Sequence, residues 1–310
     1  MMKISFPWFG EEDSITIDHL NYLRGLRGVS LTLGSVPAGE LVRPELVSDL
    51  KEKIWACGYS FEVLEDLPVH RDIRLRAGDF ERYIENYKEN ISSLSMAGVR
   101  VISYGFEPDP DDAFKELGRD GLWKNLELFV REIIPVALRK GVNMAFRFGR
   151  AGEKGLEMPK LINGEEDIDR FLSIHGDQRH GIAMSCAGLG ASGFNSYLGM
   201  IGKYGAMGRI HYALLRDVKA RDDDSFQEAE HCSPCDTRDM TKIMTAYYEA
   251  GYDGYARFDH SRMTSVCSRM TSVCGPGFDL YDRTVGTMFV TGILLTLDSR
   301  IKAMPKEKIA

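Results

Sequence analysis

Ionisable residues stand at the ends of several short apolar segments in this chain of 310 residues. Arg147 and the pair Asp259-His260 each follow such a segment directly, and Arg216 stands two residues after the end of another. If the segments are strands of one parallel sheet, their carboxyl ends meet and these side chains converge. A guanidinium binds a carboxylate through two parallel hydrogen bonds, which favours a hydroxylated ligand that carries a carboxylate. We therefore predict Asp259 and His260 as catalytic residues, and Arg147 and Arg216 as substrate-binding residues. The alternatives are a structural ion pair between Arg147 and Asp259 and a solvated charge at Arg216.

A second group of polar residues follows the third apolar segment. His70 is a predicted catalytic residue and Asp72 a predicted substrate contact, because both come soon after the end of a strand. A structural role explains them equally well, since either side chain could cap the helix that begins at Asp79 or brace the loop.

Eight short apolar segments rich in β-branched or aromatic residues recur at fairly even intervals. They are Ile4–Phe6, Val29–Leu33, Phe61–Leu64, Val99–Tyr104, Val142–Phe146, Gly181–Ser185, Ile210–Leu214 and Gly254–Phe258. Stretches of helical periodicity lie between most of them, which indicates βα units and a parallel sheet. Eight units in a chain of this length predict an α/β fold, a (β/α)₈ TIM barrel in a single domain over residues 1–310. A doubly wound sheet is disfavoured, because no GxGxxG follows the first strand and no GxxxxGK[ST] occurs.

Three helices are predicted from apolar residues at three- and four-residue steps. They span Phe80–Ala97, Leu126–Lys140 and Met240–Ala250, and a glycine that can end the helix follows each. Asp79 is the predicted cap of the first.

The overall composition is that of a soluble protein in a reducing compartment. The net charge of -7 disfavours a nucleic-acid partner, which normally meets a basic face. Thr284–Leu297 is the longest apolar run and is shorter than the roughly 18–20 residues that span a membrane, so we expect a buried helix and no membrane partner. The first ten residues lack the pattern of a signal peptide. We expect a cytoplasmic protein with reduced thiols.

Two cysteine-containing segments need separate interpretation. His231-Cys232-x-x-Cys235 resembles half of a zinc site, but no second pair completes four ligands, so loop thiols are the simpler interpretation. The seven residues SRMTSVC occur twice in tandem, at Ser261–Cys267 and Ser268–Cys274. We interpret this repeat as a recent duplication in a loop beside the site.

Seven motifs, in the same order along nearly the whole chain, resemble those of the mannonate dehydratase family. These are Pro37-Ala38-Gly39-Glu40, Pro68-Val69-His70-Arg71-Asp72-Ile73, Tyr83-Ile84-x-Asn86-Tyr87, Ile134-Pro135-Val136-Ala137, Phe226-x-Glu228-Ala229-x-His231, Arg257-x-Asp259-His260 and Gly277-Phe278-x-Leu280-Tyr281-Asp282-Arg283. The resemblance implies a xylose-isomerase-like barrel that converts D-mannonate to 2-keto-3-deoxy-D-gluconate and water. It also implies dimers or larger homo-oligomers, a role in sugar-acid metabolism, and substrate binding by Arg283.

The resemblance further implies a divalent metal, usually Mn²⁺, held by two histidines, one cysteine and one aspartate at strand ends. Such a metal acts as a Lewis acid on the substrate carboxylate. This chain departs from that pattern. The first histidine is replaced by Arg147, the second by Leu214, and the cysteine falls at Ser185 with Cys186 next to it, so that only Asp259 remains unambiguously.

Arginine carries no acceptor for a cation, so we expect the family's metal site to be absent and no cofactor to be bound. Asp259 and Cys186 are the only candidate metal ligands, and Mn²⁺ is implied by the resemblance alone. We hypothesise that Arg147 places its own charge near the vacated position and pairs with Asp259. Two functions follow: a sugar-acid lyase of the mannonate dehydratase type, or a catalytically inactive homologue that binds a sugar acid or a protein partner. Replacement of the family's active-site tyrosine by Phe278 favours the second.

Overall fold

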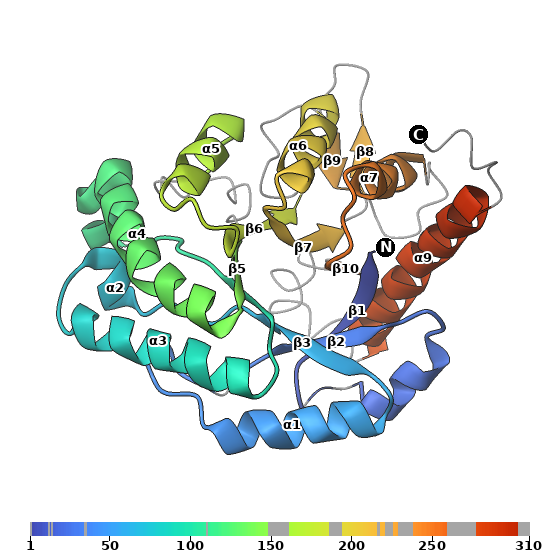
Figure 1. The fold of residues 1–310 in the computed structure, drawn as a ribbon, viewed down its shortest axis with the longest axis horizontal. Coiled ribbons are helices and arrows are strands. Elements are labelled where there is room, and N and C mark those ends of the chain that lie inside the picture. The colour runs from blue at the N-terminus through green and yellow to red at the C-terminus, as the bar shows by residue number, and fades with distance from the viewer. Residues whose placement is uncertain are drawn as a thin grey trace.

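A computed structural model describes residues 2–11, 13, 15–33, 36–109, 111–147, 161–185, 194–215, 218–220, 226–228, 238–258 and 277–302. Eight parallel strands close into a barrel in the order β1-β10-β7-β6-β5-β4-β3-β2 (Figure 1). They are β1 (Lys3–Trp8), β2 (Gly28–Thr32), β3 (Ser60–Glu65), β4 (Val101–Tyr104), β5 (Asn143–Arg147), β6 (His180–Ser185), β7 (Ile210–Leu215) and β10 (Tyr255–Phe258). Each predicted apolar segment coincides with one strand, and the predicted (β/α)₈ barrel is confirmed.

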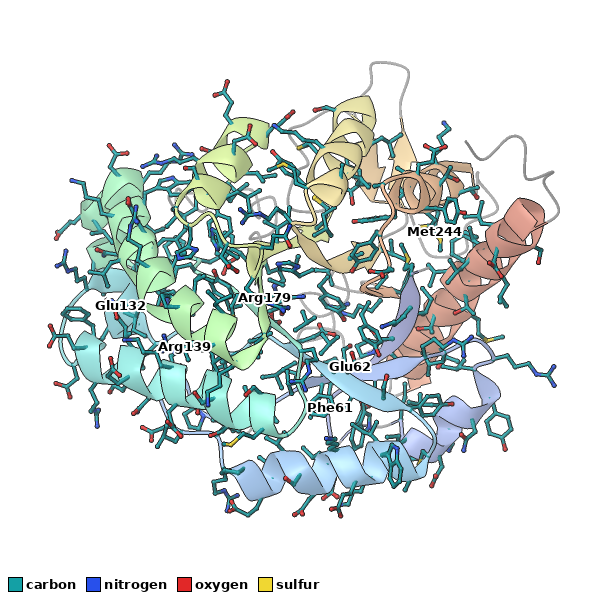
Figure 2. All side chains as sticks on the ribbon, viewed as in Figure 1. Phe61, Glu62, Glu132, Arg139, Arg179 and Met244 are labelled. Carbon is teal, nitrogen blue, oxygen red and sulfur yellow. The ribbon has the colours of Figure 1, made fainter. Side chains whose placement is uncertain are left out.

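Helices surround the strands on the outside of the barrel (Figure 1). They are η1 (Ile17–Tyr22), α1 (Pro44–Ala56), α2 (Arg71–Leu75), α3 (Phe80–Met96), α4 (Asp112–Lys140), α5 (Glu165–Ser173), α6 (Phe194–Ala206), α7 (Arg238–Glu249) and α9 (Gly277–Lys302). Their outer faces are charged, as Glu132 and Arg139 of α4 illustrate (Figure 2). A small antiparallel pair, β8 (Val218–Ala220) with β9 (Phe226–Glu228), was not predicted.

Helix α3 follows its predicted apolar pattern, and Asp79 stands at the predicted N-cap position, but its side chain does not cap the helix. Ile84, Tyr87 and Ile91 are buried at the expected spacing, and the helix ends just before Gly98. Asp79 occupies the cap position without accepting a hydrogen bond from the helix. Its carboxylate instead lies 3.4 Å from a guanidinium nitrogen of Arg82.

Helix α4 begins fourteen residues before its predicted start at Leu126. Asp111 caps it by accepting a hydrogen bond of 3.3 Å from the amide of Phe114. Gly118 then interrupts the helical backbone with φ 65° and ψ 177°, which breaks the periodicity that prediction depends on. Gly141 ends the helix in the left-handed conformation, as predicted.

Two apolar layers hold the barrel together. The larger one lies between the strands and the surrounding helices, and the smaller fills the barrel interior with Val63, Val101, Ala145, Ala183, Tyr212, Leu214 and Tyr255. Since successive strand residues face opposite sides, membership of the inner layer shows which strand-end residues point into the mouth. Arg147 stands two residues after Ala145 and therefore faces inward.

The predicted buried segment Thr284–Leu297 lies within α9. Thr287, Val290 and Thr291 are buried, whereas Met288 and Leu295 are exposed, so the helix has one face against the barrel. Among the residues that the structure describes, no helix is long and apolar enough to cross a membrane.

The two ends of the barrel differ in what lines them. At the amino-terminal end, the first residues of β1, β4, β5, β7 and β10 border a cavity of about 760 Å³, which Glu62 and Arg179 also line. The carboxyl end carries the polar strand-end residues, and chemistry in this fold takes place there.

Candidate active site

An ion pair occupies the carboxyl-terminal mouth of the barrel. Nη1 of Arg147, the last residue of β5, lies 2.8 Å from Oδ2 of Asp66, which directly follows β3. Both side chains are about one third exposed, at 36% for the arginine and 33% for the aspartate. The mouth therefore presents a positive charge that is already partnered and still accessible.

Asp66 points into the mouth because its backbone is unusual. Its φ of 56° lies in the left-handed region, where aspartate is one of the few residue types without a large penalty. Its amide donates to the Ser103 hydroxyl at 2.9 Å, and the amide of Leu67 donates to the Ser103 carbonyl at 3.0 Å. Strand alternation is broken at this point, so both Glu65 and Asp66 face the barrel axis.

Burial perturbs the carboxyl groups of the mouth. It raises the pKa of Asp66, and the charges of Arg147 and Arg257 oppose part of that rise. It also raises the pKa of Glu107, which follows β4, again against the influence of Arg147. Carboxyl groups whose pKa values move towards neutral pH are suited to exchange protons with a ligand.

A buried polar network forms the floor beneath this pair. Oε2 of Glu65 accepts a hydrogen bond of 2.8 Å from Nε of Arg257, and both side chains are about 5% exposed. Oε1 of Glu65 accepts from the hydroxyls of Tyr212, at 2.8 Å, and Ser30. Arg257 also donates to the carbonyl of Phe258, so the network fixes the end of β10 immediately before Asp259.

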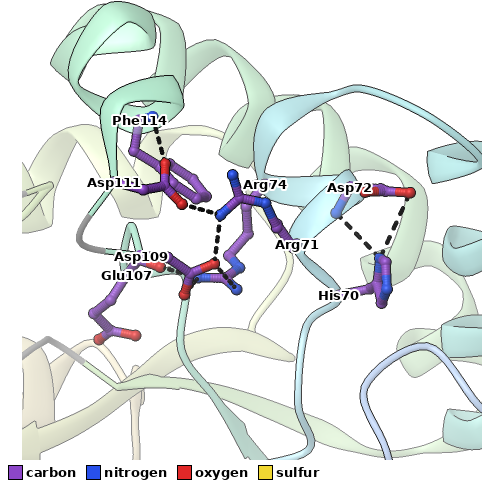
Figure 3. A network of polar contacts seen from close by, with 8 residues as sticks. All are labelled: His70, Arg71, Asp72, Arg74, Glu107, Asp109, Asp111 and Phe114. Carbon is purple, nitrogen blue, oxygen red and sulfur yellow. Dashed lines mark hydrogen bonds and ion pairs between the residues drawn. The ribbon is translucent and has the colours of Figure 1, made fainter.

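His70 and Asp72 brace the loop after β3. Nδ1 of His70 accepts a hydrogen bond of 3.1 Å from the amide of Asp72 and caps α2 (Figure 3). The His70 ring stacks on Tyr83 with 3.7 Å between ring centres. The carboxylate of Asp72 accepts from the amide of Asp79 at 3.4 Å. These contacts match the structural alternative, while the proposed catalytic and substrate contacts of His70 and Asp72 stay predictions.

Three of the family-like motifs meet around this histidine. Gly39 has φ +85°, and a Cβ there would lie 2.5 Å from Cδ1 of Tyr83. The carbonyl of Gly39 accepts a hydrogen bond of 2.7 Å from Asn86, and the hydroxyl of Tyr87 donates to the carbonyl of Leu67 at 3.3 Å. The motifs thus supply packing that holds the loop after β3.

A set of charged contacts, which we call the clasp, joins α2 to the start of α4 (Figure 3). Arg71 pairs with Asp109 at 3.1 Å and with Asp111, and Arg74 donates twice to Asp109 at 3.0 Å. The hydrogen bond from Arg71 lowers the pKa of Asp111. Arg74 also donates to the carbonyl of Glu107. The clasp therefore fixes the loop that carries Glu107 into the mouth.

Asp66 and Glu107 were missed by the sequence interpretation, although both are carboxylates just after strands. The other predicted site residues are not among those that the structure describes. Asp259, His260, Cys186 and Arg216, the tandem repeat and the segment from His231 to Cys235 lie outside the described residues, as does the side chain of Arg283 in α9. The hypothesis that Arg147 pairs with Asp259 therefore stays a prediction, because Asp259 lies outside the described residues.

The described strand-end residues do not fit a divalent metal held in the family's manner. Arg147 is a permanent cation already engaged with Asp66, and Leu214 is buried in the apolar interior layer. Ser185 offers a hydroxyl in place of a thiolate. Within the described ranges, no three His, Cys, Asp or Glu side chains gather in a way that could hold a metal ion.

Comparison with known proteins identifies the family. The family model of D-mannonate dehydratase (UxuA) matches residues 2–112 and 109–304. The mannonate dehydratase of Thermotoga neapolitana is 30% identical over 353 aligned positions, covering 94% of this chain and 97% of the relative. Mannonate dehydratase 2 of Halalkalibacterium halodurans is 28% identical over 94% of this chain and 98% of its own. The Thermotoga alignment exceeds the 310 residues of this chain by 43 positions, so at least that many have no counterpart here.

Solved structures give the same result. The mannonate dehydratase of Streptococcus suis serotype 2 superimposes with a TM-score of 0.83 at 26% identity, covering 99% of this chain and 97% of that one. The D-psicose 3-epimerase of Clostridium cellulolyticum H10 has a TM-score of 0.59 at 15% identity over 96% of this chain and 99% of its own, which shows the shared fold alone. This chain is a member of the D-mannonate dehydratase family.

Proposed function

We propose that the mouth of the barrel binds a sugar acid, D-mannonate or a close relative, with the ligand carboxylate on Arg147. The observation that carries the proposal is the accessible guanidinium of Arg147 at the end of β5, in a barrel of this family. Guanidinium and carboxylate are matched in shape and charge. Asp66 and Glu107 lie close enough to influence this guanidinium electrostatically, and their carboxyl groups suit the hydroxyls of the ligand.

The reaction that family membership supports is the dehydration of D-mannonate to 2-keto-3-deoxy-D-gluconate. A base removes the proton on the carbon next to the carboxylate, and the hydroxyl on the following carbon leaves as water with a proton from an acid. The resulting enol gains a proton on that following carbon and loses its hydroxyl proton, which gives the 2-keto acid. Asp66 and Glu107 can serve as acid and base because their pKa values are raised. Arg147 offsets the negative charge that builds on the ligand carboxylate. His260 and His70 remain predicted proton-transfer groups.

A second function is sugar-acid binding without turnover. It is favoured by Arg147 and Leu214 at two positions where the family's histidine ligands are expected. An arginine supplies one fixed charge but cannot act as a Lewis acid on the substrate. We propose that the family's metal site has been lost from this chain.

The two functions separate in one experiment. Purified protein is incubated with D-mannonate, with and without Mn²⁺, and the 2-keto-3-deoxy acid is measured beside calorimetric binding. Product formation supports the lyase, and binding without product supports the inactive homologue. Arg147→Met should abolish both the binding of D-mannonate and the formation of product. Arg131→Met, on the exposed face of α4, should leave both as in wild type. Absence of both binding and product would reject the sugar-acid site, and stoichiometric Mn²⁺ bound through Asp259 would reject the loss of the metal site.

A further inference from the structure

We infer that Asp66 is an internal counter-ion that occupies the ligand-carboxylate position on Arg147, so that an acidic ligand binds by displacing it. This inference rests on the proposed sugar-acid site and adds to it a residue that determines specificity. The pair is formed by Oδ2 of Asp66 and Nη1 of Arg147, 2.8 Å apart. A ligand carboxylate approaching from the mouth would compete for the same guanidinium.

The contacts of Asp66 allow such an exchange. Its backbone is fixed, because its amide donates to Ser103 at 2.9 Å and the next amide, of Leu67, donates to the Ser103 carbonyl at 3.0 Å. Its carboxylate is held less tightly, since the hydroxyl of Ser103 lies 3.4 Å from Oδ1. Rotation of the side chain can therefore release Arg147 while the loop after β3 keeps its shape.

The local charge balance favours exchange over simple addition. Glu65 pairs with Arg257 on the floor of the mouth, and among the described residues Arg147 is the cation that acts most strongly on both Asp66 and Glu107, with smaller influences of Arg257 on Asp66 and of Arg74 on Glu107. A third carboxylate beside an undisplaced Asp66 would place like charges together at a partly buried site, where repulsion is poorly screened. Moving the Asp66 carboxylate away from Arg147 removes most of that repulsion.

Displacement makes the site selective for acids. A neutral sugar offers hydroxyl groups only, which bind a guanidinium more weakly than the carboxylate of Asp66 does. A sugar acid replaces the contact between Arg147 and the Asp66 carboxylate with an equivalent contact between Arg147 and its own carboxylate. The ion pair thus excludes neutral sugars of the same stereochemistry and weakens the binding of acids by the free energy needed to release Asp66.

The test compares wild type with Asp66→Asn, which keeps the hydrogen-bonding shape and tolerates the left-handed backbone. The Kd values for D-mannonate and for neutral D-mannose are measured by calorimetry. Asp66→Asn should bind D-mannonate at least tenfold more tightly than wild type. In an Arg147→Met background, the same substitution should not restore the binding of D-mannonate. Glu62→Gln, which removes a carboxylate from the same strand at the opposite end of the barrel, should match wild type.

Three outcomes would overturn the inference. The first is that Asp66→Asn binds D-mannonate no more tightly than wild type does. The second is that wild type binds D-mannose as tightly as it binds D-mannonate. If no variant binds D-mannonate, the proposed function fails, and titration with formate then tests the displacement alone. Tighter formate binding by Asp66→Asn than by wild type would retain the inference, and equal binding would overturn it. Asp66→Gly, which accepts the same backbone, provides a second variant if the asparagine form does not fold.

Discussion

Glu65 on β3 accepts a hydrogen bond of 2.8 Å from Arg257 on β10, a strand that is not its neighbour in the barrel. The next residue, Asp66, pairs with Arg147 at the end of β5. Two consecutive carboxylates therefore connect the end of β3 to two other strands, one through a buried pair and one through an accessible pair. The buried pair supports the barrel, and the accessible pair is placed to meet a ligand.

Glu65→Gln should lower the free energy of unfolding by about 3 kcal/mol, because it leaves the buried guanidinium of Arg257 without its counter-charge. Urea unfolding followed by circular dichroism measures this change. Glu127→Gln removes an exposed pair with Arg131 and should change stability by no more than about 0.5 kcal/mol. Equal effects of the two substitutions would show that the buried pair does not stabilise the barrel.

His70→Ala should lower the free energy of unfolding by about 1–2 kcal/mol, through loss of the cap on α2 and of the stacking on Tyr83. Thermal unfolding of this variant is compared with that of His19→Ala, whose side chain is exposed. If His70 acts only in catalysis, stability would stay at the wild-type value while activity falls.

Gly39→Ala should destabilise the protein at least twice as much as Gly58→Ala. Both glycines have φ near +85°, so both substitutions carry the left-handed penalty of about 1–2 kcal/mol. A Cβ at Gly39 also meets the ring of Tyr83 at 2.5 Å, whereas a Cβ at Gly58 meets nothing within 4 Å. Urea midpoints of the two variants check the difference, and equal midpoints would mean that the Tyr83 ring moves aside freely.

Stability should fall as the pH drops from about 6.5 towards 4. Burial lowers the pKa of His180 to about 4 and that of His211 to about 4, from 6.5 in the unfolded chain. Between these values the unfolded state binds more protons than the folded state, so acid favours unfolding. Each histidine contributes on the order of 3 kcal/mol to the full loss.

The raised pKa values of Asp66 and Glu107 act on stability in the opposite direction, so the effect of the histidines is measured as a difference between variants in the slope of unfolding free energy against pH between 5 and 6.5. His180→Gln should reduce the slope whatever its effect on absolute stability. An unaltered slope in His180→Gln would show that this ring takes up its proton as readily in the folded chain as in the unfolded one.

The barrel could be predicted from the sequence because its strands lie between two apolar layers, and this leaves compact runs of β-branched and aromatic residues. Short elements leave no such trace. Helix α2 has five residues, and β8 and β9 have three each, which is too few for a period to be recognised. The first half of α4 was missed because Gly118 interrupts its helical backbone.

The site was predictable only in part, and for related reasons. Arg147 was found because it ends a regular strand on the inward face. Asp66 was not, because alternation places it opposite Glu65 unless the backbone turns left-handed, and aspartate alone does not predict that turn. Glu107 lies in a loop that the clasp holds through contacts of Arg74, which is distant in sequence.

The positive charge at the end of β5 is part of the polypeptide. It does not exchange with the medium and cannot be removed by a chelator, and a guanidinium does not lose its proton in proteins. The positive charge of Arg147 is therefore present in the mouth as soon as the chain has folded, and it does not depend on the ions in solution. The same charge cannot be adjusted by changing the medium. It is removed only by mutation and offset only by a neighbouring group such as Asp66.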